Sequence, residues 1–115
     1  MSEQKKIRGG ALLARAFKQK GVEHAFTLAG GFCNPALEGF MECQMPVITC
    51  PNEQVAGHLA DGHARITRKP TLCLVGPEGF ANAVPAMLEA WGERSPVIFV
   101  TGSSTLKRQG SGGFK

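Results

Sequence analysis

The sequence predicts an α/β fold, in which a doubly wound parallel sheet of four strands is flanked by helices. Two observations predict it. Four short runs are apolar almost throughout, and a segment with the apolar spacing of a helix separates each run from the next. Strands that are apolar on both faces are typical of parallel sheets covered by helices on both sides. The four predicted strands are His24–Leu28, Val47–Cys50, Thr71–Val75 and Val97–Thr101.

The predicted helices alternate with these strands, and local signals set their ends. Gly21 is a good stop for the first helix, and Pro35 suits the first turn of the second. Asn52 can cap the third helix, and Pro96 breaks the fourth. The tail from Gly102 onward is rich in Ser, Gly and Lys and is expected to be an exposed loop. The expected helices are Gly9–Lys20, Pro35–Glu42, a helix that follows Asn52 to about Ile66, and one from about Phe80 to Trp91.

Length, charge and composition limit the classes of protein that the chain can be. A chain of 115 residues is long enough for one domain, here residues 1–115. The net charge of +4 comes from scattered Lys and Arg, and there is no Tyr, whereas nucleic-acid binders cluster such charge beside stacking aromatics. No run approaches the roughly 18 apolar residues of a membrane span, and the polar start is not a secretory signal. We therefore expect no nucleic-acid partner, no membrane partner and a cytoplasmic location.

The four cysteines indicate reduced, structural thiols. They are Cys33, Cys43, Cys50 and Cys73, and no two of them have the C-x-x-C spacing with which a pair of thiolates shares a zinc ion. Two lie in predicted buried strands, where cysteine behaves as a small hydrophobe. We therefore expect no metal ligands among them.

One acid and two glycine-bearing loops fall where open α/β sheets bind ligands. Glu53 directly follows the second predicted strand, Gly30 and Gly31 follow the first, and the segment Gly76–Gly79 follows the third. The carboxyl ends of parallel strands share one edge of the sheet, so these residues converge on one crevice. Alternatively, Glu53 stabilises a helix N-terminus and the glycines form simple turns. A nucleotide site is a weaker alternative, because neither common phosphate-binding glycine pattern is present.

Three blocks of sequence, in order and over nearly the whole chain, resemble a known family. The blocks are Gly9-Gly10 with Gly21–Phe26 and Gly30-Gly31; Glu53 with Ala60-Asp61-Gly62-His63-Ala64-Arg65; and Phe80–Val84 with Ala90-Trp91 and Ser95–Ser103. Together they resemble the N-terminal pyrimidine-binding domain of thiamine diphosphate-dependent enzymes, of the acetolactate synthase-like and benzaldehyde lyase-like kind. The stretch that begins at Glu53 is the most specific of the three.

The resemblance implies a cofactor, thiamine diphosphate, and a role for five residues. In such enzymes the residue matching Glu53 is catalytic: it hydrogen-bonds a ring nitrogen of the aminopyrimidine and favours the imino tautomer, which removes the proton from the thiazolium carbon. The resulting carbanion attacks a 2-oxo acid or an aldehyde. The implied cofactor-binding residues are Gly30, Gly31, Glu53, Gly79 and Asn82. An Asn in the first turn of a helix is also a common structural choice, and so Asn82 has that alternative.

The resemblance also implies partners, because the family's site is shared between domains. The family's domain has more strands than the four predicted here, so this one is expected to be incomplete at its C-terminal end. The Mg²⁺ ion and the diphosphate belong to a domain absent from this chain, on the same or another subunit of a homo-oligomer. The chain is therefore expected to be part of a lyase or transferase, a carboligase or decarboxylase, and inactive alone.

Several positions depart from the family pattern; Phe32 weakens a benzaldehyde lyase-like substrate, whereas Glu78, Lys115 and the missing strands favour an alternative function. Glu78 occupies a position that is usually proline, Lys115 falls where an active-site glutamine is expected, and Phe32 replaces the histidine of benzaldehyde lyases. A second acid near Glu53 would repel it. The alternative is a catalytically incomplete association module that pairs with a larger homologue.

Overall fold

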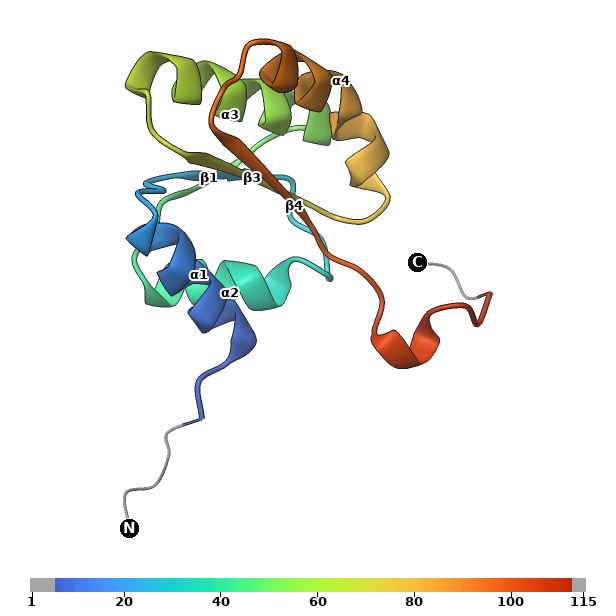
Figure 1. Cartoon of the computed structure of the whole chain (residues 1–115). Coiled ribbons are helices and arrows are strands. Elements are labelled where there is room, and N and C mark those ends of the chain that lie inside the picture. Colours follow the sequence, from blue (N-terminus) through green and yellow to red (C-terminus); the bar gives the residue numbers. More distant parts are fainter. Residues whose placement is uncertain (1–5, 113–115) are drawn as a thin grey trace.

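The computed structural model describes residues 6–112 and confirms the α/β class. Its four strands form one parallel sheet in the order β2-β1-β3-β4 (Figure 1). Parallel register pairs Phe26 with both Ile48 and Cys73, and Cys73 in turn with Phe99. The chain thus leaves β1 toward β2 on one side and returns to β3 on the other. The strands are β1 Ala25–Thr27, β2 Val47–Thr49, β3 Thr71–Val75 and β4 Val97–Thr101.

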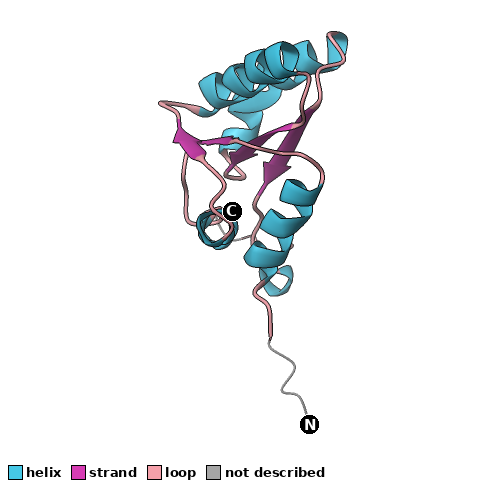
Figure 2. Ribbon diagram, turned by 90° about the vertical axis from the view of Figure 1, so that its left-hand side faces the viewer, coloured by secondary structure: helices cyan, strands magenta, loops and turns pink. Residues whose placement is uncertain are grey.

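Helices cover the sheet on both faces, as a doubly wound fold requires. One layer holds α1 and α2, and the other holds α3 and α4; Figure 2, turned by 90°, shows the strands between these two layers. The helices are α1 Gly9–Gln19, α2 Asn34–Glu42, α3 Glu53–Thr67 and α4 Gly79–Gly92. Among residues 6–112, no helix is long and apolar enough to cross a membrane.

The continuous apolar character of β3 has a direct structural reason. All five of its residues are buried, and successive side chains point to opposite faces. Leu72 and Leu74 join the core beneath α1 and α2, which is centred on Phe40. Cys73 and Val75 join a second core beneath α3 and α4. Because helices cover both faces of this central strand, neither face is exposed to water, and apolar residues are favoured on both.

Small residues let the helices of each layer pack closely. A Cβ added at Gly39 of α2 would lie 2.1 Å from the carbonyl oxygen of Gly10 in α1. In the other layer, a Cβ at Gly57 of α3 would lie 2.5 Å from the Cβ of Ala86 in α4. The two helix pairs touch through backbone and methyl groups, so their spacing depends on these glycines.

Charged groups join α3 to α4 on the outer side of their contact. Asp61 is buried, and its carboxylate accepts hydrogen bonds from Arg65 at 3.1 and 2.5 Å. Arg65 also lies 3.4 Å from Glu89 of α4. Burial acts to raise the pKa of Asp61, but the Arg65 guanidinium, together with Ser95 and His58, outweighs it and holds that pKa below its ordinary value.

The element boundaries differ from the predicted ones in small ways. β1 is shorter than predicted by one residue at each end, β2 ends at Thr49, and α4 begins one residue earlier, at Gly79. The tail is not wholly a loop, since Leu106–Arg108 form a short 3-10 helix, η1, in which the Arg108 N–H bonds the Thr105 carbonyl at 2.8 Å. Such single turns need only local hydrogen bonds, so no apolar pattern announces them. Lys115 lies outside the described residues.

Candidate functional site

A small cavity opens at the carboxyl end of the sheet, between β1 and β3. At this point the connections from β1 lead to opposite sides of the sheet, toward β2 and toward β3. The volume of the cavity is about 190 Å³. Leu28, Ala29 and Gly30 line it from the segment after β1, and Gly76, Glu78 and Gly79 line it from the segment after β3. Glu53 enters from the start of α3, which follows β2. This is the place where open α/β sheets bind their ligands.

The start of α3 holds Glu53 by a cap and by its own polarity. The side chain of Asn52 accepts a hydrogen bond from the Val55 N–H at 2.8 Å, which confirms the predicted cap. Glu53 is the first residue of the helix and is half-buried. A carboxylate at this end of a helix is stabilised by the positive end of the macrodipole. The acid is therefore favoured at this point before any ligand is considered.

Gly79 lets the Glu53 side chain lie directly on the first turn of α4. A Cβ added at Gly79 would be 2.3 Å from Oε1 of Glu53 and 2.5 Å from its Cδ. Any larger residue would have to displace the carboxyl group. Close approach is thus the structural reason for glycine at position 79, and the approaching group is the predicted catalytic acid.

Asn82 is the second group of α4 that meets the acid. Its side-chain amide donates a hydrogen bond to Oε2 of Glu53, with 3.2 Å between the two atoms. Asn82 is exposed, so this amide lies at the rim of the site. Gly79 and Asn82 are three residues apart on one helix and therefore approach the same carboxyl group from one side.

The two glycines after β1 are placed differently from each other. Gly30 lines the cavity, and its carbonyl accepts the Cys33 N–H at 2.8 Å in a tight turn. Gly31 is exposed and is not among the residues that line the cavity. A Cβ at either position would meet nothing within 4 Å. Packing within the described residues therefore does not require glycine at positions 30 and 31.

Glu78 brings a second carboxylate to the same cavity. It lies beside the turn that follows β1: burial raises the pKa of the Cys33 thiol, and the Glu78 carboxylate raises it further. Sequence reasoning identified Glu78 as a second acid near Glu53 but missed Leu28 and Ala29. The sequence could have indicated them, because Leu28 ends the first predicted strand and Ala29 directly follows it.

His24 and His63 make contacts within the fold. His63 of α3 packs its ring 4.8 Å from that of His24 and 5.8 Å from that of Phe26, and its Nδ1 lies 3.1 Å from Oγ1 of Thr71. These contacts give His63 a structural role within the fold. Within residues 6–112, no group of three or more His, Cys, Asp or Glu side chains is arranged to hold a metal ion.

The fold is of the doubly wound α/β class with a cavity at its switch point, and comparisons with known proteins define the family. The family model described as "Thiamine pyrophosphate enzyme, N-terminal TPP binding domain" matches residues 7–115. The chain therefore belongs to the N-terminal cofactor-binding domains of thiamine diphosphate enzymes, and the resemblance seen in the sequence is confirmed.

The curated relatives that resemble the chain carry names of several different activities. The chain is 32% identical over 107 residues to a probable acetolactate synthase of Mycobacterium bovis, covering 92% of this chain and 20% of the relative. It is 30% identical over 103 residues to a sulfoacetaldehyde acetyltransferase of Roseovarius nubinhibens, covering 88% and 17%. A probable 2-ketoarginine decarboxylase of Pseudomonas aeruginosa is 29% identical over 114 residues, covering 97% and 20%. The chain thus spans about a fifth of the length of these relatives.

Proposed function

We propose that this chain is the pyrimidine-binding part of an acetolactate synthase-like carboligase or decarboxylase that acts on 2-oxo acids or aldehydes, with Glu53 as its catalytic acid. One observation carries the proposal. The Glu53 carboxyl group lies in the cavity at the switch point of the sheet, against Gly79 and within hydrogen-bond distance of Asn82. The family membership and the activities named for the relatives support the same reaction class.

The volume of the cavity supports binding of the pyrimidine half of the cofactor. Sites that enclose a whole drug-sized ligand have roughly 300–1,000 Å³, whereas this cavity has about 190 Å³, enough for a single ring. Glu53 would hydrogen-bond a ring nitrogen, and Asn82 would fix the orientation of its carboxyl group. Gly30 and Gly79 would leave room for the ring, and the exposed Gly31 would contact the cofactor from outside the cavity. When bound, thiamine diphosphate supplies the carbon nucleophile that adds to the substrate carbonyl.

The remainder of the site would come from a partner. We propose a diphosphate-binding domain of the same or another subunit, within a homo-oligomer, as the holder of the diphosphate and Mg²⁺. The support is the small cavity and the fifth of the relatives' length that the chain spans. The four free thiols suit a reducing compartment, and we propose the cytoplasm.

Replacing the acid tests this function. In an enzyme that carries this domain together with its diphosphate domain, Glu53→Gln should slow hydrogen–deuterium exchange at the thiazolium carbon of bound cofactor by orders of magnitude. The amide keeps the size of the side chain, so the unfolding temperature should stay close to that of the unchanged protein. Unchanged exchange in the variant would reject the catalytic role.

Gly79→Ala tests the same role through the position of the acid. The added Cβ would push the flexible end of Glu53 by about 1 Å, and misplacement of that size can slow catalysis by about 100-fold. The side-chain amide signals of Asn82 in a ¹⁵N spectrum of the isolated chain should shift, while the unfolding temperature changes little. An unmoved Asn82 signal would show that Gly79 does not position the acid.

A second candidate is an association module that lacks catalysis. The observation that favours it is Glu78, which places a second carboxylate in the cavity that holds Glu53. It predicts that the chain co-purifies with a larger homologue and that Glu78→Pro, which restores the usual family residue, creates no turnover in the assembled pair. A gain of activity in that variant would instead support an active family site modified by Glu78.

The domain boundary has its own test. We propose that residues 1–115 are the N-terminal part of a domain that continues beyond residue 115. The mass of the native product in its source cells decides this: a product of roughly 50–60 kDa, as expected for three domains, would support it. A product with the mass of the 115-residue chain would contradict it.

A further inference from the structure

Two histidines meet at the end of the sheet opposite the Glu53 cavity. His24 directly precedes β1 and His63 lies in α3, and their ring centroids are 4.8 Å apart. Nδ1 of His63 also lies 3.1 Å from Oγ1 of Thr71, the first residue of β3. β1 and β3 run parallel, so the pair lies where both strands begin, whereas the Glu53 cavity lies where they end. β1 is flanked by β2 and β3, and the pair therefore lies over the interior of the sheet rather than at an edge.

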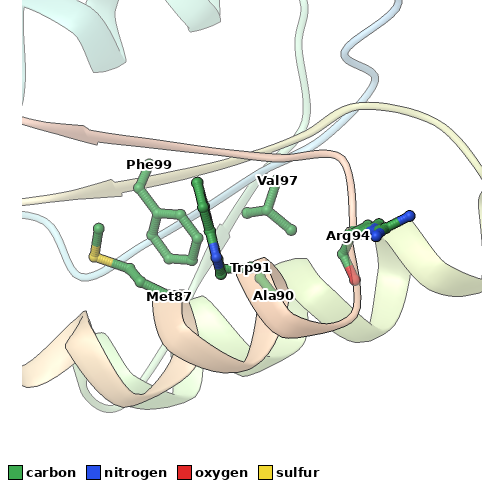
Figure 3. Close-up of a pocket in the computed structure, with 7 residues that line it drawn as sticks. Met87, Ala90, Trp91, Arg94, Val97 and Phe99 are labelled. Atoms are coloured by element: carbon green, nitrogen blue, oxygen red, sulfur yellow. The ribbon is translucent and has the colours of Figure 1, made fainter.

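The groove between α4 and β4 offers no comparable set of donors. Figure 3 shows its apolar side chains, which include Met87, Trp91 and Phe99. Among residues 6–112, the side chains that line this groove include no His, Cys, Asp or Glu. An ion that prefers imidazole nitrogen has no ligand there, in contrast to the histidine pair.

The ring nitrogens of the pair differ in their partners. Nδ1 of His24 is buried and has no hydrogen-bond partner within the described residues. Such an atom is uncommon in a folded protein and calls for an explanation, of which a bound ion is one. Nδ1 of His63 is engaged with Thr71, which leaves its Nε2 for a ligand. The pair thus supplies one buried nitrogen without a partner and one imidazole that is held through its other nitrogen.

We propose that His24 and His63 together bind one divalent ion of a late first-row transition metal, with water in its other positions. Imidazole nitrogens suit such ions and bind them at about 2.0–2.1 Å. Two imidazoles at that distance, separated by about 90–109° at the ion, have ring centroids about 4.5–5.2 Å apart. The observed 4.8 Å falls within this range. His24 would bind through Nδ1 and His63 through Nε2, while Nδ1–H of His63 donates to Thr71, as the second nitrogen of a metal-bound histidine commonly does.

Two charged neighbours balance each other beside the pair. Glu23 directly precedes His24, and its Oε1 lies 2.5 Å from Nζ of Lys69. Lys69 lowers the pKa of Glu23, and positive charge on His24 or His63 lowers it further. A carboxylate that responds to charge on both rings would also attract a cation bound between them, which offsets the repulsion from Lys69. The pair supplies two protein ligands, fewer than the three or four of zinc sites, so we expect weaker binding than such sites show. The inference does not rest on the proposed function, because the pair lies away from the Glu53 cavity.

Titration of the 115-residue chain with Ni²⁺ tests the proposal. Calorimetry should give one ion per chain. In proton NMR spectra, the ring signals of His24 and His63 should shift or broaden, whereas those of His58, the third of the three histidines, should not change. At about ten times the dissociation constant, Ni²⁺ should raise the unfolding temperature by about 5–10 °C, because it binds the folded chain preferentially. Absence of binding up to about 1 mM Ni²⁺, or spectral changes confined to His58, overturns the proposal.

Matched variants locate the ion. His24→Gln should weaken Ni²⁺ binding by about 10-fold or more, whereas His58→Gln should leave it unchanged. His58 is the fitting control, because it lies 3.5 Å from Glu89 and so offers a competing site. Thr71→Val keeps the shape of a buried strand residue and should weaken binding by about 10-fold, since it removes the acceptor for His63.

Circular dichroism verifies that each variant folds. If His24→Gln does not fold, the ring signals of the unchanged chain and the affinity of Thr71→Val decide the matter. Unchanged affinity in both His24→Gln and Thr71→Val would overturn the proposal, and so would loss of binding in His58→Gln.

Discussion

The contact between α1 and α2 makes a sharp prediction about two glycines that composition alone cannot distinguish. Gly39 and Gly62 both lie inside helices, so replacing either by alanine gains roughly 1 kcal/mol of helix propensity. At Gly62 an added Cβ meets nothing within 4 Å. At Gly39 it would lie 2.1 Å from the Gly10 carbonyl oxygen and 2.7 Å from the Ala11 nitrogen, both backbone atoms that no rotamer change can move.

The magnitude follows from the separation that the helices need. The two helices must part by about 1 Å or more for the Gly39 contact to reach ordinary van der Waals distance. Overpacking of this kind costs about 1–3 kcal/mol, and the propensity gain offsets part of it. We therefore expect Gly39→Ala to lower the free energy of unfolding by about 1–2 kcal/mol. Gly62→Ala should raise it by about 0.5–1 kcal/mol.

Urea unfolding followed by circular dichroism measures both values. Each kcal/mol corresponds to about 4–8 °C in unfolding temperature for a domain near this size, so the two variants should also separate clearly on heating. If Gly39→Ala were as stable as the unchanged chain, the helix contact would not be limited by backbone approach. The reasoning would also be refuted if Gly62→Ala were the less stable of the two.

Two further predictions come from titratable groups. The folded pKa of Asp61 lies below its unfolded value, so the stability it contributes is present above about pH 4 and is lost as the pH falls through the folded pKa. Urea unfolding of Asp61→Asn should accordingly show a flatter acid dependence than the unchanged chain, and an identical dependence would contradict this. Burial, and to a smaller extent Cys50, raises the pKa of Cys73 to about 12, whereas Cys43 is half-buried. At about pH 8 iodoacetamide should therefore label Cys43 first in the folded chain and Cys73 only after unfolding, as peptide mass spectrometry would show; equal labelling of both would argue against it.

By itself the sequence determined the fold class and the location of the candidate acid. Alternating helical and apolar segments leave few arrangements other than a parallel sheet between helix layers. A residue that closely follows an apolar strand in such a sheet must lie at its carboxyl edge, which placed Glu53 correctly. The Asn52 cap was equally local, because it depends on residues three positions apart.

Tertiary structure decided which of these residues meet and in which order the strands lie in the sheet. The contact of Gly79 and Asn82 with Glu53 joins positions 26 and 29 residues apart, and its geometry depends on how α4 packs beside α3. Within residues 6–112, the order β2-β1-β3-β4 likewise places β4 beside β3 alone, although its sequence is as apolar as that of the central strand β3. The spacing of apolar residues along the sequence indicates which side of a helix or strand is buried. Strand order and helix spacing depend on packing between distant segments, and no local pattern encodes them.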